Sequence, residues 1–229
     1  MHSFNKNGID ITEWVIVTSV TYPLFSKTNK YIKRAEETEE YNGNFKTSKL
    51  ISVTMLLKDL CKFPIELQHQ VEKFIIEKLY TRSTEWIEID GRYTNVILED
   101  VDDGEMYQGI ITVTYKSLSG NWFTEEKTKE INGVLNYKGI ESTKYFKMEL
   151  TPTTNKVQIG HSESGENFII KPKSTIHKIY VSFEDKTVIQ NDAHAPIDIQ
   201  SNFFELKVGS NTFSCTGASG VIKYREVLA

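Results

Sequence analysis

Cysteine, proline and long apolar runs are scarce in this sequence, and each shortage excludes a class of protein. The 229 residues include five prolines and two cysteines, Cys61 and Cys215, which lie far apart. A disulfide-framed mini-protein is therefore excluded, and we expect two reduced, partly buried thiols. No run of 18 apolar residues occurs, so the sequence predicts no membrane span. Residues 1–8 lack the apolar segment of a signal peptide, so nothing suggests secretion by that route.

A large surplus of charge of either sign is also lacking. The 27 Lys and Arg residues nearly balance the 31 Asp and Glu residues, which gives a formal net charge of −4. Neutralising DNA phosphates takes a basic surplus. We therefore expect no specific nucleic-acid binding.

Motifs for catalysis or metal binding are absent or incomplete. The acidic run Glu99-Asp100-Val101-Asp102-Asp103-Gly104-Glu105 is the best candidate for calcium, but Val101 occupies a position where a calcium loop needs oxygen. A solvated acidic turn is the favoured interpretation. The five histidines show no zinc spacing, and no GxSxG nucleophile motif occurs. We predict no metal, no cofactor, no catalytic residue and no enzymatic activity.

Short alternating runs of apolar and polar residues predict a mainly β protein. Residues 9–25, 48–58 and 107–118 have this pattern, and residues 85–98 read as a hairpin across Asp90-Gly91. One helix is expected over 64–80, because Pro64 suits a first turn and a stripe of apolar residues follows. The stripe consists of Leu67, Val71, Phe74, Ile75 and Leu79.

The second half of the chain contains only strand patterns, which indicates a β-sandwich. The expected strands are 131–137, 144–151, 156–161, 167–171, 176–183, 186–190, 203–207, 211–216 and 220–226. The charged stretch 124–130 has no apolar residue before Ile131 and is read as a joint. We therefore predict an N-terminal β-sandwich-like domain with one helix and a protruding arm over 1–125, and a β-sandwich over 126–229.

The arm, residues 26–49, is the most unusual segment. Basic residues come first and acidic residues second, with Asn42-Gly43-Asn44 expected as a turn. One interpretation is a solvated loop whose charges pair internally. The other is a contact in which the basic part of one subunit meets the acidic part of a neighbour. The candidate interface residues are Lys27, Lys30, Tyr31, Lys33, Arg34, Glu36, Glu37, Glu39, Glu40 and Tyr41.

Several segments together resemble one family. The opening Asn7-Gly8-Ile9-Asp10, then strand, charged arm, strand and a single helix, is similar to the start of the siphophage distal tail proteins (Dit). The stretch from Phe203 to Phe213 resembles the closing pattern F-x-L-x-x-G-x-N of that family. The strand from Val221 to Glu226 resembles its V-x-I-x-Y-R ending.

This resemblance implies a tail-tip and baseplate hub component of a Gram-positive-infecting phage or a prophage. The family implies a ring-forming N-terminal domain and an outer galectin-like β-sandwich. Six copies would form a ring between the tail tube and the hub or baseplate, leaving a channel for DNA. The implied partners are itself as a homo-hexamer, the major tail (tube) protein, the tail-associated hub protein and, through the C-terminal domain, a receptor-binding protein. The implied location is the tail tip of the virion, after synthesis in the host bacterial cytoplasm.

Sugar binding is the alternative function, since β-sandwiches commonly carry aromatic platforms for sugar rings. The three tryptophans, at 14, 86 and 122, all fall in the first half. The second half has only Tyr and Phe, mostly at alternating positions where burial is the default. A carbohydrate-binding module for host-surface adhesion therefore remains the second hypothesis, behind a structural assembly protein.

Overall fold

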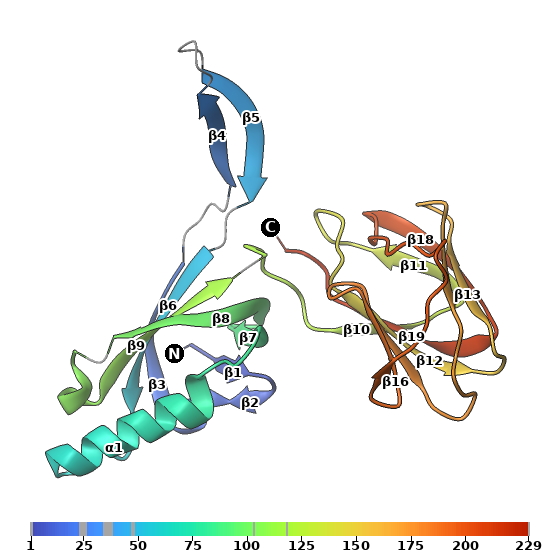
Figure 1. Ribbon diagram of the computed structural model, residues 1–229. Helices are drawn as coiled ribbons and strands as arrows, with labels where there is room; N and C mark the ends of the chain where they lie inside the picture. The colour runs from blue at the N-terminus through green and yellow to red at the C-terminus, as the bar shows by residue number, and fades with distance from the viewer. Residues whose placement is uncertain are drawn as a thin grey trace. The chain divides into compact units, whose positions relative to one another are not determined.

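The chain folds into two compact units that divide between Trp122 and Phe123 (Figure 1). The computed structural model describes residues 2–22, 27–33, 39–46, 49–102, 104–117 and 119–228, with residues 27–33 and 39–46 described by their backbone. The boundary expected at residue 125 lies three residues beyond this division. The mainly β class is confirmed, and the described part of the chain contains one α-helix.

The first unit is built on a seven-stranded antiparallel sheet in the order β2-β1-β7-β8-β9-β6-β3. Short 3₁₀ helices cover Ile11–Glu13 and Met106–Gln108. The strands are β1 (Phe4–Lys6), β2 (Ile9–Asp10), β3 (Val15–Thr21), β6 (Lys49–Leu57), β7 (Glu85–Ile89), β8 (Arg92–Asp102) and β9 (Ile110–Ser117). The predicted hairpin turn is present, because Asp90 and Gly91 both have positive φ, as a tight two-residue turn requires.

One helix covers one face of this sheet. Helix α1 (Pro64–Phe74) continues into a π-helical turn at Ile75–Leu79, so the predicted range of 64–80 is close to the observed one (Figure 1). Leu67, Val71, Phe74 and Leu79 are buried, as the apolar stripe predicts. The partner layer of the sheet is therefore this helix.

The C-terminal end of the helix is held by buried polar groups. The hydroxyl of Tyr115 donates a hydrogen bond to the carbonyl of Leu79 over 3.2 Å. The Nζ of Lys6 donates to the carbonyl of Tyr80 over 2.8 Å and lies 2.7 Å from an oxygen of Glu85. A cation at this position also opposes the negative end of the helix dipole.

The second unit is a β-sandwich of two antiparallel sheets. A six-stranded sheet has the order β10-β19-β12-β15-β16-β17, and a four-stranded sheet has the order β11-β18-β13-β14. The strands are β10 (Lys127–Glu130), β11 (Gly133–Tyr137), β12 (Phe146–Pro152), β13 (Val157–His161), β14 (Glu166–Ile170), β15 (Ile179–Ser182), β16 (Thr187–Gln190), β17 (Ala193–His194), β18 (Gly209–Thr216) and β19 (Ala218–Tyr224).

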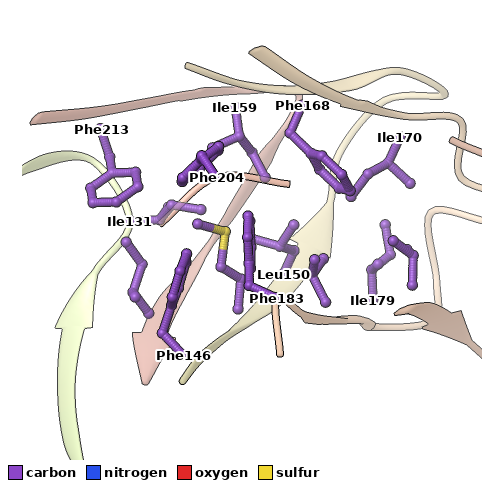
Figure 2. Packing of buried hydrophobic residues seen from close by; sticks show 14 of the residues in the cluster. Ile131, Phe146, Leu150, Ile159, Phe168, Ile170, Ile179, Phe183, Phe204 and Phe213 are labelled. Carbon is purple, nitrogen blue, oxygen red and sulfur yellow. The ribbon is translucent and has the colours of Figure 1, made fainter. Parts of the chain in front are cut away.

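Phenylalanines dominate the core between the two sheets. Phe146 and Phe183 stack with ring centroids 4.1 Å apart, and Phe183 lies 5.7 Å from Phe168 of the opposite sheet (Figure 2). Phe204 fills the space beside them, 4.7 Å from Phe183. These rings account for the sandwich, because each buries a large apolar area at once.

Two sequence-based assignments in this unit were wrong. The expected joint at 124–130 contains strand β10, an edge strand paired with β19, whose residues are largely exposed and so show no apolar alternation. The expected strand at 203–207 is not a strand apart from a bridge between Leu206 and Thr143. Phe204 and Leu206 are buried there because the connection from β17 to β18 inserts them into the core.

Candidate functional site

The predicted arm contains a two-stranded antiparallel hairpin of β4 (Lys27–Lys33) and β5 (Glu39–Lys46) (Figure 1). Its register sets Lys33 opposite Glu39 and Tyr31 opposite Tyr41. The basic strand therefore runs beside the acidic one within a single chain. Opposite charges directly across a strand pair favour that pairing.

The predicted interface residues divide into two groups. Lys27, Lys30, Tyr31 and Lys33 lie on β4, and Glu39, Glu40 and Tyr41 lie on β5, whereas Arg34, Glu36 and Glu37 lie outside the described residues. The turn expected at Asn42-Gly43-Asn44 is instead part of β5, where the register shifts by one residue. Asn and Gly suit such a bulge as well as they suit a turn. The role of the arm as a subunit contact remains a prediction.

The acidic run 99–105 belongs mostly to a strand. Glu99, Asp100 and Asp102 lie on β8 and are exposed, and Lys116 of β9 pairs with Glu99 at 3.7 Å. Within the described ranges, no three His, Cys, Asp or Glu side chains are grouped so as to hold a metal ion. Both cysteines are free and half-buried.

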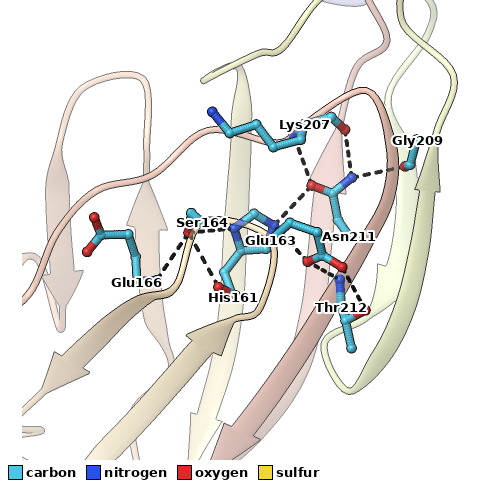
Figure 3. Close-up of polar contacts among 8 residues, drawn as sticks. All are labelled: His161, Glu163, Ser164, Glu166, Lys207, Gly209, Asn211 and Thr212. Carbon is cyan, nitrogen blue, oxygen red and sulfur yellow. Dashed lines mark hydrogen bonds and ion pairs between the residues drawn. The ribbon is translucent and has the colours of Figure 1, made fainter.

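The closing pattern of the chain has a clear structural basis at Asn211. This side chain is fully buried at the start of β18. Its amide nitrogen donates to the carbonyls of Lys207 and Gly209, over 2.7 and 3.1 Å, and its oxygen accepts from the backbone N–H of Lys207 over 2.8 Å (Figure 3). Asn211 thus closes the turn into β18 in place of backbone bonds.

Beside Asn211 lies a polar cluster around His161, which no pattern in the sequence predicts. The backbone bonds of Asn211 fix its amide so that the oxygen faces His161, 3.0 Å from Nε2. Nε2 therefore carries the proton, and Nδ1 accepts a hydrogen bond from the hydroxyl of Ser164 over 2.8 Å. Glu163 accepts from both the N–H and the hydroxyl of Thr212, over 2.6 and 2.8 Å. The cluster binds the β13–β14 turn to β18 (Figure 3).

The environment of His161 keeps its ring neutral. The ring stacks against Phe204 and Phe213, at centroid distances of 4.7 and 4.9 Å. Burial lowers the pKa of His161 below its usual value, because the charged form would lose its hydration there. Ser164 also accepts a hydrogen bond from the N–H of Glu166 over 3.3 Å. This arrangement of serine, histidine and asparagine serves to fix a turn.

The residues that follow the last strand join the end of the second unit to its beginning. Arg225 donates to the carbonyl of Thr124 over 3.0 Å, and the buried Glu226 pairs with Lys127 at 2.5 Å. The N–H of Val227 donates to the hydroxyl of Tyr137 over 3.0 Å. Burial raises the pKa of Tyr137 to about 12, so this hydroxyl stays protonated. The ending Tyr224-Arg225-Glu226 therefore connects the end of the sandwich to the residues at its start.

The outer face of the six-stranded sheet carries an exposed aromatic side chain. Tyr180 of β15 is 49% exposed and lies between Glu149 of β12 and Ile189 of β16 in the register. A tyrosine beside a carboxylate is one platform on which a sugar ring could stack.

Across the described residues, no helix is long and apolar enough to cross a membrane.

Comparisons with known proteins agree with these observations. Residues 138–227 match the family model for the C-terminal domain of the siphovirus-type tail component. The crystal structure of SPP1 Dit (gp 19.1), described as a paradigm of the hub adsorption apparatus in Gram-positive infecting phages, has the same fold. That likeness covers 100% of both chains, with a TM-score of 0.70 and 13% sequence identity. No curated protein sequence matches the chain. Residues 138–227 are thus similar to the C-terminal domain of siphovirus-type tail components, and the whole chain has the fold of a Dit protein.

Proposed function

We propose that this tail component assembles as a hexameric ring at the tail tip, between the tail tube and the hub or baseplate, with a central channel for DNA. The observation that carries the proposal is the Dit fold over the full length of the chain, together with the family match of residues 138–227. Its partners are further copies of itself, the major tail protein and the tail-associated hub protein. It resides in the virion and is made in the host bacterial cytoplasm.

The arm supplies one contact between neighbouring copies in this proposal. A hairpin that extends from one chain can lie on the next copy, and a closed ring repeats this contact at every interface. The sequence of β4 is rich in basic residues and that of β5 begins with acidic ones, a composition that suits a polar contact sensitive to salt. The galectin-like outer sandwich serves as a platform for receptor-binding components.

A purely structural role, without catalysis, is part of the proposal. The polar cluster at His161 has its hydrogen bonds satisfied within the fold, and its serine hydroxyl accepts a backbone N–H. Such a cluster stabilises a turn and leaves no free nucleophile at Ser164.

Size-exclusion chromatography with light scattering tests the proposal directly. A ring of six has a mass of about 158 kDa, six times the chain mass of 26.3 kDa. Particles of that mass that appear as rings in electron micrographs would support the proposal. A stable monomer at micromolar concentration would contradict it.

Adhesion to a host carbohydrate is the second candidate, and exposed Tyr180 is the observation that favours it. Binding of the purified protein to a glycan array, lost in Tyr180→Ala but kept in a Tyr107→Ala control in the first unit, would support this function. Tyr107 is a suitable control because it is also exposed, at 63%. The absence of glycan binding in the parent protein would exclude it.

A further inference from the structure

The two ends of the second unit's sandwich differ in the connections that form them. The chain enters this unit at the end where Lys127 of β10 lies opposite Tyr224 of β19, which we call the entry end. Strand β12 begins beside Tyr224 and ends at Pro152, so the connection that follows β12 lies at the other end, the far end. By register, the connections from β14 to β15 and from β16 to β17 also lie there. The far-end segments are 153–156, 171–178 and 191–198.

Basic side chains prevail at the far end. Its charged residues are four lysines and two aspartates: Lys156, Lys171, Lys173, Lys178, Asp192 and Asp198. All four lysines are exposed, and Lys171 pairs with Asp198 at 3.0 Å. The other three lysines form no ion pair with any described residue.

The entry end has the opposite balance of charge. Its segments carry eight carboxylates and five basic groups, and they are 124–126, 138–145, 162–165, 183–186, 202–208 and 225–228. The sandwich therefore has one basic end and one acidic end, although the whole unit is close to neutral.

Exposed isoleucines lie among the far-end lysines. Ile176 is 85% exposed in the β14–β15 connection, and Ile197 and Ile199 are exposed in the segment after β17. The two segments meet at Lys171, whose N–H donates to the carbonyl of Pro196 over 2.9 Å. Single exposed apolar side chains are common on soluble proteins, but several on adjoining segments indicate an interaction site.

A buried glutamine holds the β14–β15 connection in place. The side-chain oxygen of Gln190 accepts from the N–H of Lys173 over 2.8 Å. Its amide nitrogen donates to the carbonyls of Ser174 and His177, over 2.6 and 2.9 Å. Ile176 lies between these two bonded carbonyls, so its exposure follows from a fixed backbone.

We propose that the far end binds the surface of an anionic phospholipid bilayer, with the Ile176 side chain between the head groups and the lysines against the phosphates. An apolar tip flanked by lysines fits this interface, because the apolar side chain leaves water at the head-group level while the ammonium groups meet anionic lipids. The lysine stems suit the same depth, since their methylenes pack on apolar surface while their charged ends stay in water. The inference concerns a single chain and needs no ring, so it stands apart from the proposed function.

A soluble polyanion is the competing ligand for the same lysines. A chain of phosphate groups binds ammonium groups by charge and counterion release, and it gains nothing from an exposed isoleucine. Gln190 fixes the connection so that Ile176 faces outward, which favours a ligand with an apolar interior.

Sedimentation with lipid vesicles tests the proposal on the full chain. Vesicles of phosphatidylglycerol and phosphatidylcholine in equal parts are compared with vesicles of phosphatidylcholine alone. Lys173→Glu/Lys178→Glu changes the far end, and Lys138→Glu/Lys186→Glu makes the same change of charge at exposed positions of the entry end. The far-end variant should lower the partition coefficient on anionic vesicles at least about tenfold, since each lysine near an anionic surface contributes about fivefold. The control should leave it nearly unchanged.

A second pair of variants tests the apolar tip. Ile176→Ser should lower the partition coefficient about threefold, whereas Ile140→Ser, at an exposed position of the entry end, should not change it. Full binding by Ile176→Ser would overturn the proposal, because the ligand would then be a polyanion recognised by charge alone.

Two other results would also overturn the proposal. One is a parent protein that does not sediment with anionic vesicles, and the other is an equal loss of binding in the far-end variant and its charge control. If the charge reversal prevents folding, Lys173→Gln/Lys178→Gln decides, since it removes the two charges without adding new ones and should still weaken binding about tenfold.

Discussion

Replacing Asn211 by alanine should selectively destabilise the second unit. The variant loses the acceptor for two donors, the N–H of Lys207 and Nε2–H of His161, and the donor for two carbonyls. The carbonyls of Lys207 and Gly209 belong to residues that are at least partly exposed, so water can replace the lost amide there. The two donors count most, since a buried donor left unsatisfied costs about 1–3 kcal/mol.

The expected loss is therefore about 2–6 kcal/mol, a large fraction of the stability of a typical domain, about 5–15 kcal/mol. For a unit of this size, 1 kcal/mol corresponds to a shift of about 4–8 °C in Tm. The unfolding transition of the second unit should thus fall by at least about 8 °C, measured by scanning calorimetry on the full chain.

The three tryptophans provide an internal control for this experiment. All of them, at 14, 86 and 122, belong to the first unit, so tryptophan fluorescence follows the unfolding of that unit alone. A matched variant, Asn202→Ala, removes an exposed asparagine that bonds to Glu166 and should change the Tm little. The reasoning is refuted if both variants shift the calorimetric transition equally, or if Asn211→Ala lowers only the tryptophan transition.

Three further predictions concern pH, a buried ion pair and the arm. Because burial lowers the pKa of His161, the unfolded chain takes up a proton first as pH falls. The stability of the second unit should therefore decrease below about pH 6.5 and level off once the folded protein is protonated. His161→Phe should flatten this part of the profile of Tm against pH, and an unchanged slope would contradict the assignment. Lys6→Met leaves Glu85 without its cation and should cost the first unit about 3 kcal/mol in urea unfolding followed by tryptophan fluorescence, with Lys6→Met/Glu85→Gln recovering part of the loss. Lys33→Glu should lower the fraction of assembled ring, measured by light scattering, more at low salt than at high salt. Restoration by Lys33→Glu/Glu39→Lys would show that the charges pair within the hairpin, whereas no salt-dependent change would exclude an electrostatic role for Lys33.

The predicted elements that the structure contains are those specified by local patterns. The Asp90-Gly91 turn follows from the ability of these residues to adopt positive φ, and the helix start follows from Pro64 and the stripe behind it. The arm does contain paired strands, but the turn expected at Asn42-Gly43-Asn44 lies inside β5 instead. In each case the determining residues are within a few positions of one another.

The errors and omissions involve contacts between distant parts of the chain. Strand β10 exists because Lys127–Glu130 pairs with β19 almost a hundred residues later, and at an exposed edge no apolar alternation marks it. Phe204 and Leu206 alternate as a strand would, but they fill the core from a connection. Alternate residues are buried in a strand and in this connection alike, so periodicity could not distinguish the two.

The sequence by itself determined a mainly β chain with one helix, a charged arm and no motif for catalysis or metal binding, because periodicity and turn chemistry act over short distances. Tertiary structure alone decided that His161 meets Asn211, 50 residues further on, and that one face of the first sheet is covered by α1 while the other presents paired hydroxyls. The same Ser and Thr residues are ordinary strand residues in the sequence. Only the register of β6 and β9 brings Ser52 opposite Thr114 and Thr54 opposite Thr112, since register is set by the packing of the whole sheet.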